Sequence, residues 1–315
     1  MTFKDASMKW FSEYAYQFQK KTTYTRNQQL SKRTYQRFGS KEINEITRAD
    51  IQAFLNDLNK DGVSERNGKP LAYKTRKHYL TYISDVFKFC VEEELIKESP
   101  CRNIRVAPDP YDESKENNLF SLEEAKELLN LINTEAPLKY RCFFFLAFSS
   151  GMRRSELMGL EWRDIDFETG VIRINRVSNY TSATGKYTDT TKTKGSKRCI
   201  IVPEYTINIL MEYQNENPFD RVFVQKNGKP MHNNTPYTWL KRFCQAHNLK
   251  FLGIHKFRHL YASILINAGL DVATVSRCLG HSQISTTLTI YTHAFNEAYI
   301  KGCTAVCSAL EDVLK

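Results

Sequence analysis

The chain has 315 residues, enough for about two domains, and its 41% hydrophobic and 25% charged residues are ordinary values for a globular protein. Lys and Arg exceed Asp and Glu by ten, which favours a polyanionic partner. The longest apolar run, Cys142–Phe148, is far shorter than the roughly 18 residues of a membrane span, and the first residues lack the apolar stretch of a secretory signal. Eight scattered cysteines, none in a Cys-x-x-Cys pair, favour reduced thiols over disulfides or a zinc site. We therefore expect a soluble cytoplasmic protein that contacts no membrane.

The first part of the chain, residues 1–105, has the apolar periodicity of helices. An amphipathic stripe predicts the first helix and packing of its apolar side chains in the core; it comprises Met8, Phe11, Tyr14, Ala15 and Phe18. Two further helices are predicted over residues 48–58 and 71–94. The stripe of the last one comprises Tyr79, Tyr82, Ile83, Val86 and Phe87.

Positive charge is concentrated in the same part of the chain. Through residue 110 there are 20 basic and 14 acidic residues, so +6 of the net +10 lies in about a third of the sequence. Two runs contain no acidic residue, and interleaved Thr and Tyr hydroxyls are further donors for phosphate oxygens. The candidate DNA-binding residues in these runs are Lys20, Lys21, Arg26, Lys32, Arg33, Arg37, Lys74, Arg76 and Lys77. On charge alone, a solvated basic face is an equally good interpretation.

A polar segment with two prolines, residues 106–118, is the best candidate for a linker. Ser121 and Glu124 beyond it have the spacing of a capping box, so a second domain is predicted over residues 119–315.

This second domain is expected to open with helices, including residues 140–148. Strands then fit residues 162–167, 171–177 and 198–202, with a polar loop over 178–197. From about residue 234 the chain is predicted to be helical again, with stops at Gly269 and Gly280 and starts at Asp271 and Ser285. The expected fold class is mostly α with a small antiparallel β-sheet.

Four short motifs in this domain carry the residue types of a catalytic site. They read Ser-Ser-Gly-Met-Arg-Arg-Ser-Glu-Leu at 149–157, Thr-Lys-Thr-Lys-Gly-Ser-Lys-Arg at 191–198, Gly-Ile-His-Lys-Phe-Arg-His at 253–259, and Leu-Gly-His at 279–281 followed by Tyr at 291. In this order and spacing, the motifs resemble the tyrosine recombinase (phage integrase) family, and the Thr-Lys-Thr pattern favours its integrase branch. The resemblance implies a helical SAM-like core-binding domain over residues 1–105 and a tyrosine-recombinase catalytic domain.

The resemblance also implies roles for single residues. Arg153 and Arg258 bind the reacting phosphate, for which the planar, permanently charged guanidinium is well suited. Tyr291 is the nucleophile and forms a 3′-phosphotyrosyl link with DNA. Arg154 is expected at the surface or on the DNA backbone, because adjacent residues of a helix point in different directions and Arg154 therefore points away from the site of Arg153.

The proton-transfer groups follow by the same resemblance. Lys192 matches the hairpin lysine that protonates the leaving 5′-oxygen, with Lys194 as its close rival. His255 is the acid/base partner and His281 a hydrogen-bond donor to phosphate. Glu156, one helical turn after Arg153, is expected to brace the site rather than react.

Several residues permit other interpretations. Tyr299 is an alternative nucleophile eight residues after Tyr291, and His259 and His293 are expected to pack or support rather than catalyse. His255 and His259 have the i, i+4 spacing of zinc ligands, but the cationic Arg258 between them argues against a metal.

The expected function is a site-specific recombinase that cleaves and rejoins DNA without metal, ATP or another cofactor, for integration and excision of a phage or mobile element. Its expected partners are double-stranded DNA at a specific site, three further copies in a synaptic homotetramer, and a possible accessory directionality factor. A C-terminal helix over residues 295–314 is expected to dock on a neighbouring protomer. No N-terminal arm-binding domain precedes the core-binding pattern, so we expect either a two-domain recombinase or a chain that lacks a segment of longer relatives.

The alternatives are an Xer-like dimer-resolution recombinase, a catalytically silent DNA-binding protein, a type IB topoisomerase, and a metal-dependent nuclease. The nuclease would use Asp164 and Asp166 to hold magnesium.

Overall fold

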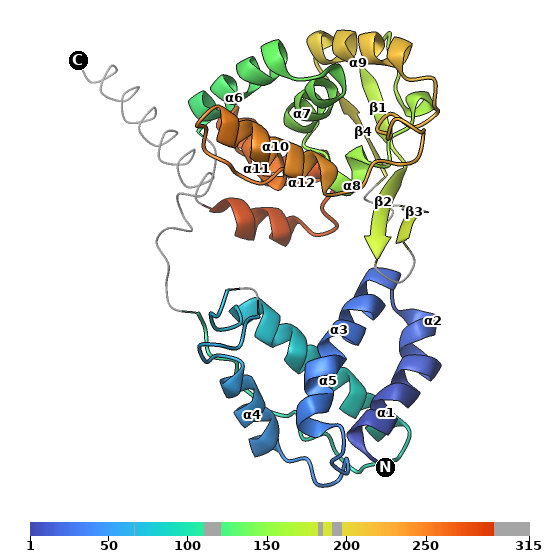
Figure 1. Cartoon of the computed structure of the whole chain (residues 1–315), viewed down its shortest axis with the longest axis vertical. Coiled ribbons are helices and arrows are strands. Elements are labelled where there is room, and N and C mark those ends of the chain that lie inside the picture. The colour runs from blue at the N-terminus through green and yellow to red at the C-terminus, as the bar shows by residue number, and fades with distance from the viewer. Residues whose placement is uncertain (66, 110–120, 182–184, 191–196, 293–315) are drawn as a thin grey trace, which may run out of the picture. The chain divides into compact units, whose positions relative to one another are not determined.

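In the computed structural model, the described residues are 1–65, 67–109, 121–181, 185–190 and 197–292. The chain divides into two compact units near residue 113. Both are largely helical, and the second also contains short strands (Figure 1). The predicted fold class, mostly α with a small antiparallel sheet, is therefore confirmed. Among the described residues no helix is both long enough and apolar enough to cross a membrane.

The first unit is a bundle of helices around one core. Its elements are α1 (Phe3–Trp10), a π-helical turn (Phe11–Ala15), α2 (Tyr16–Phe18), α3 (Lys21–Phe38), α4 (Arg48–Asp57) and α5 (Tyr73–Glu92). The predicted stripe of α5 is buried throughout. A capping box starts α4, because the Thr47 hydroxyl accepts the Asp50 amide and the Asp50 carboxylate accepts the Thr47 amide. Hydrogen bonds from the Thr47 amide, the Thr47 hydroxyl and Lys41 to the carboxylate lower the pKa of Asp50 to about 2.

The predicted stripe of the first helix is wrong in part. Met8, Tyr14 and Phe18 are exposed, whereas the buried face starts with Phe3 and continues through Trp10. The helix begins close to the N-terminus and passes through a π-helical turn, which shifts the inward face relative to a regular 3.6-residue period.

The first residues of the predicted linker are bonded to the first unit. The carboxylate of Asp109 accepts two hydrogen bonds of 2.9 Å from the Tyr73 amide at the start of α5. It also accepts a 2.6 Å bond from the guanidinium of Arg76, whose side chain is 1% exposed. A carboxylate at a helix N-terminus is stabilised by the helix dipole, so this contact fixes the chain as far as residue 109.

The second unit is built around α7. Its helices are α6 (Leu122–Glu135), α7 (Leu138–Ser150), α8 (Arg154–Leu157), a 3₁₀ turn (Trp162–Asp164), α9 (Glu204–Glu216), α10 (Thr235–Ala246), α11 (His255–Asn267) and α12 (Val272–Leu279). The predicted capping box of Ser121 and Glu124 is present at the start of α6. Residues 284–292 are also helical.

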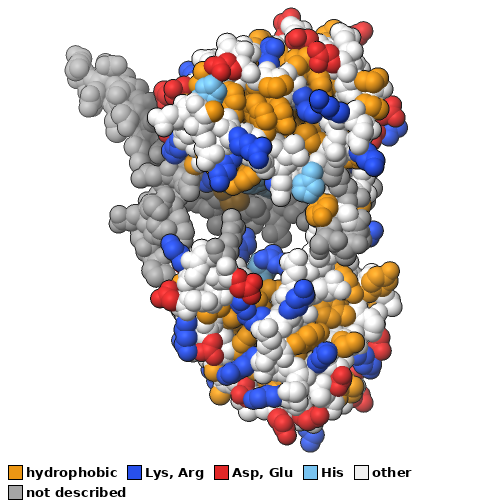
Figure 2. Space-filling model, viewed as in Figure 1, with side chains coloured by type: hydrophobic (Ala, Val, Ile, Leu, Met, Phe, Trp, Pro, Cys, Tyr) orange, Lys and Arg blue, Asp and Glu red, His pale blue; other side chains and the backbone are white. Residues whose placement is uncertain are grey.

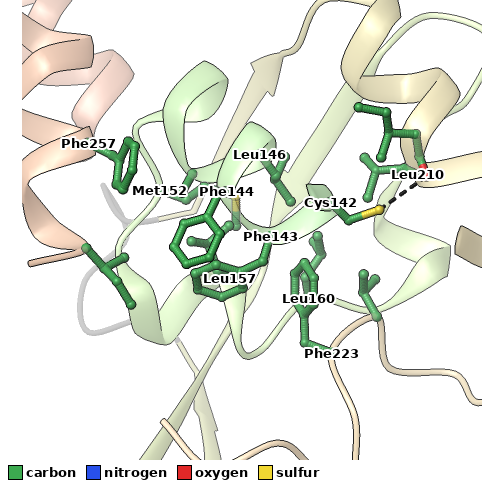
Figure 3. Close-up of a cluster of buried hydrophobic side chains, with 14 of the residues drawn as sticks. Cys142, Phe143, Phe144, Leu146, Met152, Leu157, Leu160, Leu210, Phe223 and Phe257 are labelled. Carbon is green, nitrogen blue, oxygen red and sulfur yellow. Dashed lines mark hydrogen bonds between the residues drawn. The ribbon is translucent and has the colours of Figure 1, made fainter. Parts of the chain in front are cut away.

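Figure 3 shows how α7 supplies the centre of this core. The Phe143 ring meets Phe223 at 5.1 Å between centroids, and the Phe144 ring meets Phe257 of α11 at 5.9 Å. On another side, the Cys142 thiol donates to the Ile209 carbonyl of α9 at 3.2 Å. Because α7 is apolar nearly all round, neighbouring elements cover it on several sides, and its C-terminal end is held firmly.

The strands differ from the sequence prediction. β1 (Val171–Ile174) pairs antiparallel with β4 (Arg198–Ile201), and β2 (Arg176–Thr181) pairs with β3 (Gly185–Thr190). Two expectations are therefore wrong: the strand over 171–177 is broken at residue 175, and part of the predicted polar loop over 178–197 forms strands. The side chains of β3 are mostly polar, so its sequence lacks the alternation of apolar and polar residues that predicts a strand.

The strand predicted over residues 162–167 is also wrong. The Glu161 amide donates to the Asp164 carboxylate at 3.0 Å, and this local bond closes a 3₁₀ turn instead. Only an isolated bridge between Ile165 and Ile172 remains of the expected pairing.

Candidate active site

Arg153 lies directly after α7 and caps the short helix α8. Its side chain is about one-third exposed, and its Nη1 donates to Glu156 Oε1 at 2.8 Å. The other carboxylate oxygen of Glu156 accepts the backbone amide of Arg153, also at 2.8 Å. Glu156 thus holds Arg153 by both main chain and side chain. Because about one-third of the side chain remains exposed, a ligand can still reach it.

Arg258 reaches the same place from α11. Its side chain is 2% exposed. Nη1 donates to the Gly151 carbonyl at 2.7 Å, and Nη2 donates to the Leu279 carbonyl at 2.6 Å. Burial and the neighbouring Arg153 cation lower the pKa of Arg258, but a guanidinium starts from so high a value that it remains charged at neutral pH.

Three successive carbonyls at the C-terminal end of α12 accept hydrogen bonds from three arginines. Arg198 Nε donates to Cys278 at 2.9 Å, Arg258 to Leu279 at 2.6 Å, and Arg153 Nη2 to Gly280 at 2.9 Å. The last carbonyls of a helix lack partners within it and carry the negative end of the helix dipole, which suits guanidinium donors. We call these three acceptors the carbonyl cluster.

Two glycines permit this arrangement. Gly151 ends α7 with φ +59°, and Gly280 ends α12 with φ +64°, both in the left-handed region that favours glycine. A Cβ on Gly280 would lie 2.6 Å from Arg198 Nη1, and one on Gly151 would lie 2.4 Å from the Tyr261 ring. The Gly in each motif is therefore required both by the backbone conformation and by close neighbours.

Glu156 is the buried anion among these cations, with 2% of its surface exposed. Burial alone would raise the pKa of this carboxyl. The Arg198 cation, its hydrogen bonds and the Arg153 cation outweigh burial, so the pKa of Glu156 is lowered and the group is ionised at neutral pH.

Three histidines surround the arginines. Partial desolvation and the charges of Arg258 and Arg153 lower the pKa of His255, although its surface remains accessible. Burial and then the same cations lower the pKa of His281 to about 4, and its Nδ1 lies 2.7 Å from the Thr287 hydroxyl. Burial lowers the pKa of His259 to about 4 as well, and its ring meets that of His255 at 5.1 Å. All three are therefore neutral at pH 7 in the absence of ligand.

Tyr291 lies on the helix over residues 284–292, and 6% of its surface is exposed. It packs with apolar side chains of α11 and α12, and its ring is 5.6 Å from that of His259. Burial raises the pKa of the phenol to about 12, while the Arg258 cation acts in the opposite direction. The structure thus brings Tyr291 together with Arg153, Arg258, His255 and His281.

Comparison with known proteins identifies this arrangement. The sequence model of the Phage integrase family matches residues 119–298, and that of the phage integrase N-terminal SAM-like domain matches residues 2–59. The chain belongs to the phage integrase family. It is a tyrosine recombinase, an enzyme that acts on DNA at specific sites.

Relatives of the recombinase include integrases and other tyrosine recombinases. The ICEBs1 integrase of Bacillus subtilis (strain 168) is 28% identical over 289 residues, which cover 87% of this chain and 75% of that protein. A tyrosine recombinase of Thermosipho africanus (strain TCF52B) is 29% identical over 269 residues, covering 84% and 86%.

Solved structures share the fold. The Tn1549 transposon integrase in complex with transposon right end DNA aligns with a TM-score of 0.80 at 22% identity and covers 98% of this chain and 100% of that one. A lambda integrase dimer bound to a COC′ core site aligns at 0.68 with 17% identity, covering 94% and 95%.

One buried member of the recombinase site was missed by the sequence reasoning. Arg198 opens β4, and its guanidinium bonds both the Cys278 carbonyl and Glu156. The sequence signal is its place at the end of the motif over residues 191–198, beside Lys197 and directly before the apolar run Cys199–Val202. Other predicted residues lie outside the described part of the chain, namely Lys192, Lys194, His293, Tyr299 and the helix over 295–314.

The carboxylates considered for magnesium are engaged elsewhere in the recombinase. Asp164 is 3% exposed and bonds Arg176 and Asn175, while Asp166 accepts the amides of residues 168 and 169. Among the described residues, no three His, Cys, Asp or Glu side chains gather as a metal site requires.

The candidate DNA-binding residues differ in exposure. Arg76 is buried and bonded to Asp109 and the Leu71 carbonyl, so it stabilises the first unit and we leave it out of the DNA-binding set. Arg33 is half-buried and donates to the Val63 carbonyl at 3.0 Å. The exposed candidates are Lys20, Lys21, Arg26, Lys32, Arg37, Lys74 and Lys77.

These exposed cations come from two neighbouring helices. Burial lowers the pKa of His78, and so do the positive charges of Arg26 on α3 and Lys74 on α5. Cations from both helices therefore lie close enough to affect the same side chain. On the face drawn in Figure 2, basic side chains of this unit are interspersed with acidic ones rather than forming one continuous patch.

Proposed function

We propose that the recombinase cleaves and rejoins DNA through a covalent bond between Tyr291 and a 3′-phosphate. The observation that carries this assignment is the position of the buried phenol beside Arg258, in a site where Arg153 and Arg258 are fixed by backbone carbonyls. Preorganised cations stabilise the charge that develops on a transferring phosphoryl group.

In the first step, the Tyr291 oxygen attacks phosphorus and the bond from phosphorus to the 5′-oxygen breaks. With a pKa near 12, the phenol is protonated at neutral pH and gives up its proton as it attacks. His255 is neutral and accessible, so it accepts that proton. Arg153 and Arg258 bind the non-bridging oxygens, and His281 donates a further hydrogen bond once it faces the phosphate.

The leaving 5′-oxygen takes a proton from Lys192, which belongs to the Thr-Lys-Thr motif. Rejoining is the reverse reaction, in which the 5′-hydroxyl of a second strand attacks the phosphotyrosine and releases Tyr291. Because the ester retains the bond energy, neither ATP nor a metal ion is needed to restore the DNA backbone.

The substrate is double-stranded DNA at the ends of a mobile element or phage, which the recombinase integrates and excises. The exposed basic residues of α3 and α5 bind DNA phosphates. A homotetramer joins two sites in the cytoplasm, and an accessory factor sets the direction of recombination. The integrase relatives support the mobile-element role over dimer resolution.

The test uses oligonucleotides that cover the DNA flanking the gene of the recombinase, each with a nick near the cleavage position. In EDTA, we expect wild type to become covalently attached to one of them, as seen by a gel shift that survives denaturation. Tyr291→Phe should bind the same DNA and form no adduct, because it lacks the attacking oxygen.

Tyr299→Phe is the matched control and should attach like wild type. Adduct formation by Tyr291→Phe would overturn the assignment of the nucleophile. Cleavage that requires magnesium and leaves no adduct would favour the nuclease alternative instead.

A further inference from the structure

Arg198 makes contacts that distinguish it from the two arginines assigned to the phosphate. Its side chain is 7% exposed, compared with 32% for Arg153. Three of its donors are used within the protein: Nε bonds the Cys278 carbonyl at 2.9 Å, and Nη1 and Nη2 bond Glu156 at 3.3 and 3.0 Å. All three guanidinium nitrogens of Arg198 thus bond within the protein, whereas the hydrogen bonds described for the side chains of Arg153 and Arg258 use Nη1 and Nη2 alone.

Glu156 is shared between Arg198 and Arg153. Oε1 accepts Nη1 of Arg153 at 2.8 Å and Nη1 of Arg198 at 3.3 Å, and Oε2 accepts the Arg153 amide at 2.8 Å and Nη2 of Arg198 at 3.0 Å. Arg198 therefore shares with Arg153 the neutralisation of the carboxylate charge. Without it, the buried carboxylate would have Arg153 as its remaining bonded cation and would compete with phosphate for that guanidinium.

Arg198 also fixes the segment that both other arginines bond. It holds the first carbonyl of the cluster, Cys278, and its Nη1 lies 2.6 Å from where a Cβ of residue 280 would be. The position of the Leu279 and Gly280 carbonyls, which accept Arg258 and Arg153, thus depends on Arg198.

We propose that Arg198 is a positioning residue for phosphoryl transfer: it neutralises Glu156 and anchors the end of α12, so that Arg153 and Arg258 present their free donors to the scissile phosphate. This inference rests on the roles proposed above for Arg153, Arg258 and Tyr291. Misplacing catalytic groups by a fraction of an ångström to 1 Å typically lowers rates by about 10- to 100-fold.

The experiment measures the single-turnover rate of adduct formation on the nicked oligonucleotide at saturating protein. For Arg198→Met we expect a rate about 10- to 100-fold below wild type, with affinity for the same DNA changed less than about twofold because Arg198 does not contact phosphate. Arg198→Lys keeps the charge but cannot span Glu156 and the Cys278 carbonyl together, so its rate should lie between the two.

A double-mutant cycle with Glu156→Gln separates positioning from a general loss of structure. Because one of the two roles of Arg198 is to neutralise the Glu156 carboxylate, Arg198→Met should lower the rate of the Glu156→Gln enzyme by a smaller factor than that of wild type. An equal loss in both backgrounds would overturn the proposal, as would a wild-type rate for Arg198→Met. If Arg198→Met does not fold, the rate of Arg198→Lys decides: a wild-type rate overturns the proposal.

Arg176→Met is the matched control. Arg176 also pairs with largely buried carboxylates, Glu161 and Asp164, but the hydrogen bonds described for it do not involve the carbonyl cluster. Its loss should lower stability and leave the rate of the folded enzyme unchanged; an equal fall in rate would show that any lost buried pair has this effect and would overturn the proposal. Failure of wild type to attach would instead count against the proposed function itself.

Discussion

The phenol of Tyr291 is subject to two opposing influences. Burial raises its pKa to about 12, and the Arg258 cation acts against that rise. In the DNA-free enzyme, this phenol, the proposed nucleophile, is therefore protonated at neutral pH. A phosphate bound to Arg258 changes the charge around the phenol only when DNA is present. We therefore expect the phenol to lose its proton during the attack and not before it.

His259, which touches the same phenol, makes stability depend on pH. Its pKa falls from 6.5 to about 4 on folding, so between these values the unfolded chain binds the proton more readily. The stability that a neutral His259 contributes is present above pH 6.5 and is lost as the pH falls toward 4. His281 acts in the same direction.

We expect His259→Gln to reduce this dependence. Between pH 7 and pH 5 the free energy of unfolding of wild type should fall by about 1–2 kcal/mol more than that of the variant, from 1.36 kcal/mol per unit of pKa shift. Urea unfolding at the two pH values measures it, with each protein compared with itself at pH 7. An identical fall in both proteins would contradict the assigned shift.

Single residues also show what the sequence could predict. The motifs named Arg153, His255, Arg258, His281 and Tyr291, and the structure brings these five together. Arg198 was not found because its role depends on which carbonyls lie at the end of α12, and nothing in the sequence near residue 198 records that.

At the scale of elements, the end of α12 is the structural basis of the site. The helix starts with Asp271, whose carboxylate caps it, and ends at Gly280, as the stop and start signals predicted. Local signals of this kind are readable because each lies within a few residues of its partner. The 3₁₀ turn at residues 162–164 and the strand β3 were not readable, since a side-chain bond within a turn and a polar strand leave no apolar pattern.

Gly280→Ala tests the importance of this helix end. The left-handed conformation costs an alanine about 1–2 kcal/mol, and the new Cβ would also displace Arg198, 2.6 Å away. We expect both a lower melting temperature and adduct formation slowed by about tenfold or more.

Gly269→Ala is the control for backbone strain alone. Its φ is +86°, and no atom lies within 4 Å of the added Cβ. It should lower stability by a similar amount and keep the wild-type rate of attachment. Equal rates for the two alanine variants would show that strain at a helix end, and not displacement of Arg198, controls the reaction.

At the scale of the whole molecule, charge determines how the recombinase finds its substrate. The net charge of +10 attracts DNA in general, but burial distinguishes residues that the sequence treats alike. Arg76 and Lys77 are adjacent, yet Arg76 supports Asp109 inside the first unit while Lys77 is exposed. Composition therefore predicted a polyanionic partner. Only three-dimensional packing separates the exposed cations, which are candidates for DNA binding, from the cations that stabilise the protein.

Replacing Lys74 and Lys77 by Gln should weaken binding to specific and unrelated DNA alike. Two lost phosphate contacts should reduce the slope of log affinity against log salt by roughly two. Fluorescence anisotropy over a range of salt concentrations measures this slope. Lys97→Gln, near the opposite end of α5 and about 20 Å away by the helix rise, is the control and should leave the slope unchanged; a slope that stays constant in the double variant would exclude these lysines from the interface.

The carbonyl cluster has a consequence for how the enzyme is switched on and off. Since the end of one eight-residue helix bonds all three guanidiniums, fraying of its last turn would remove a hydrogen bond from each of them simultaneously. A partly assembled centre, with one cation in place and another loose, is therefore disfavoured. The protein either has its full complement of positive charge ready for the phosphate, or it is inert toward the DNA it holds.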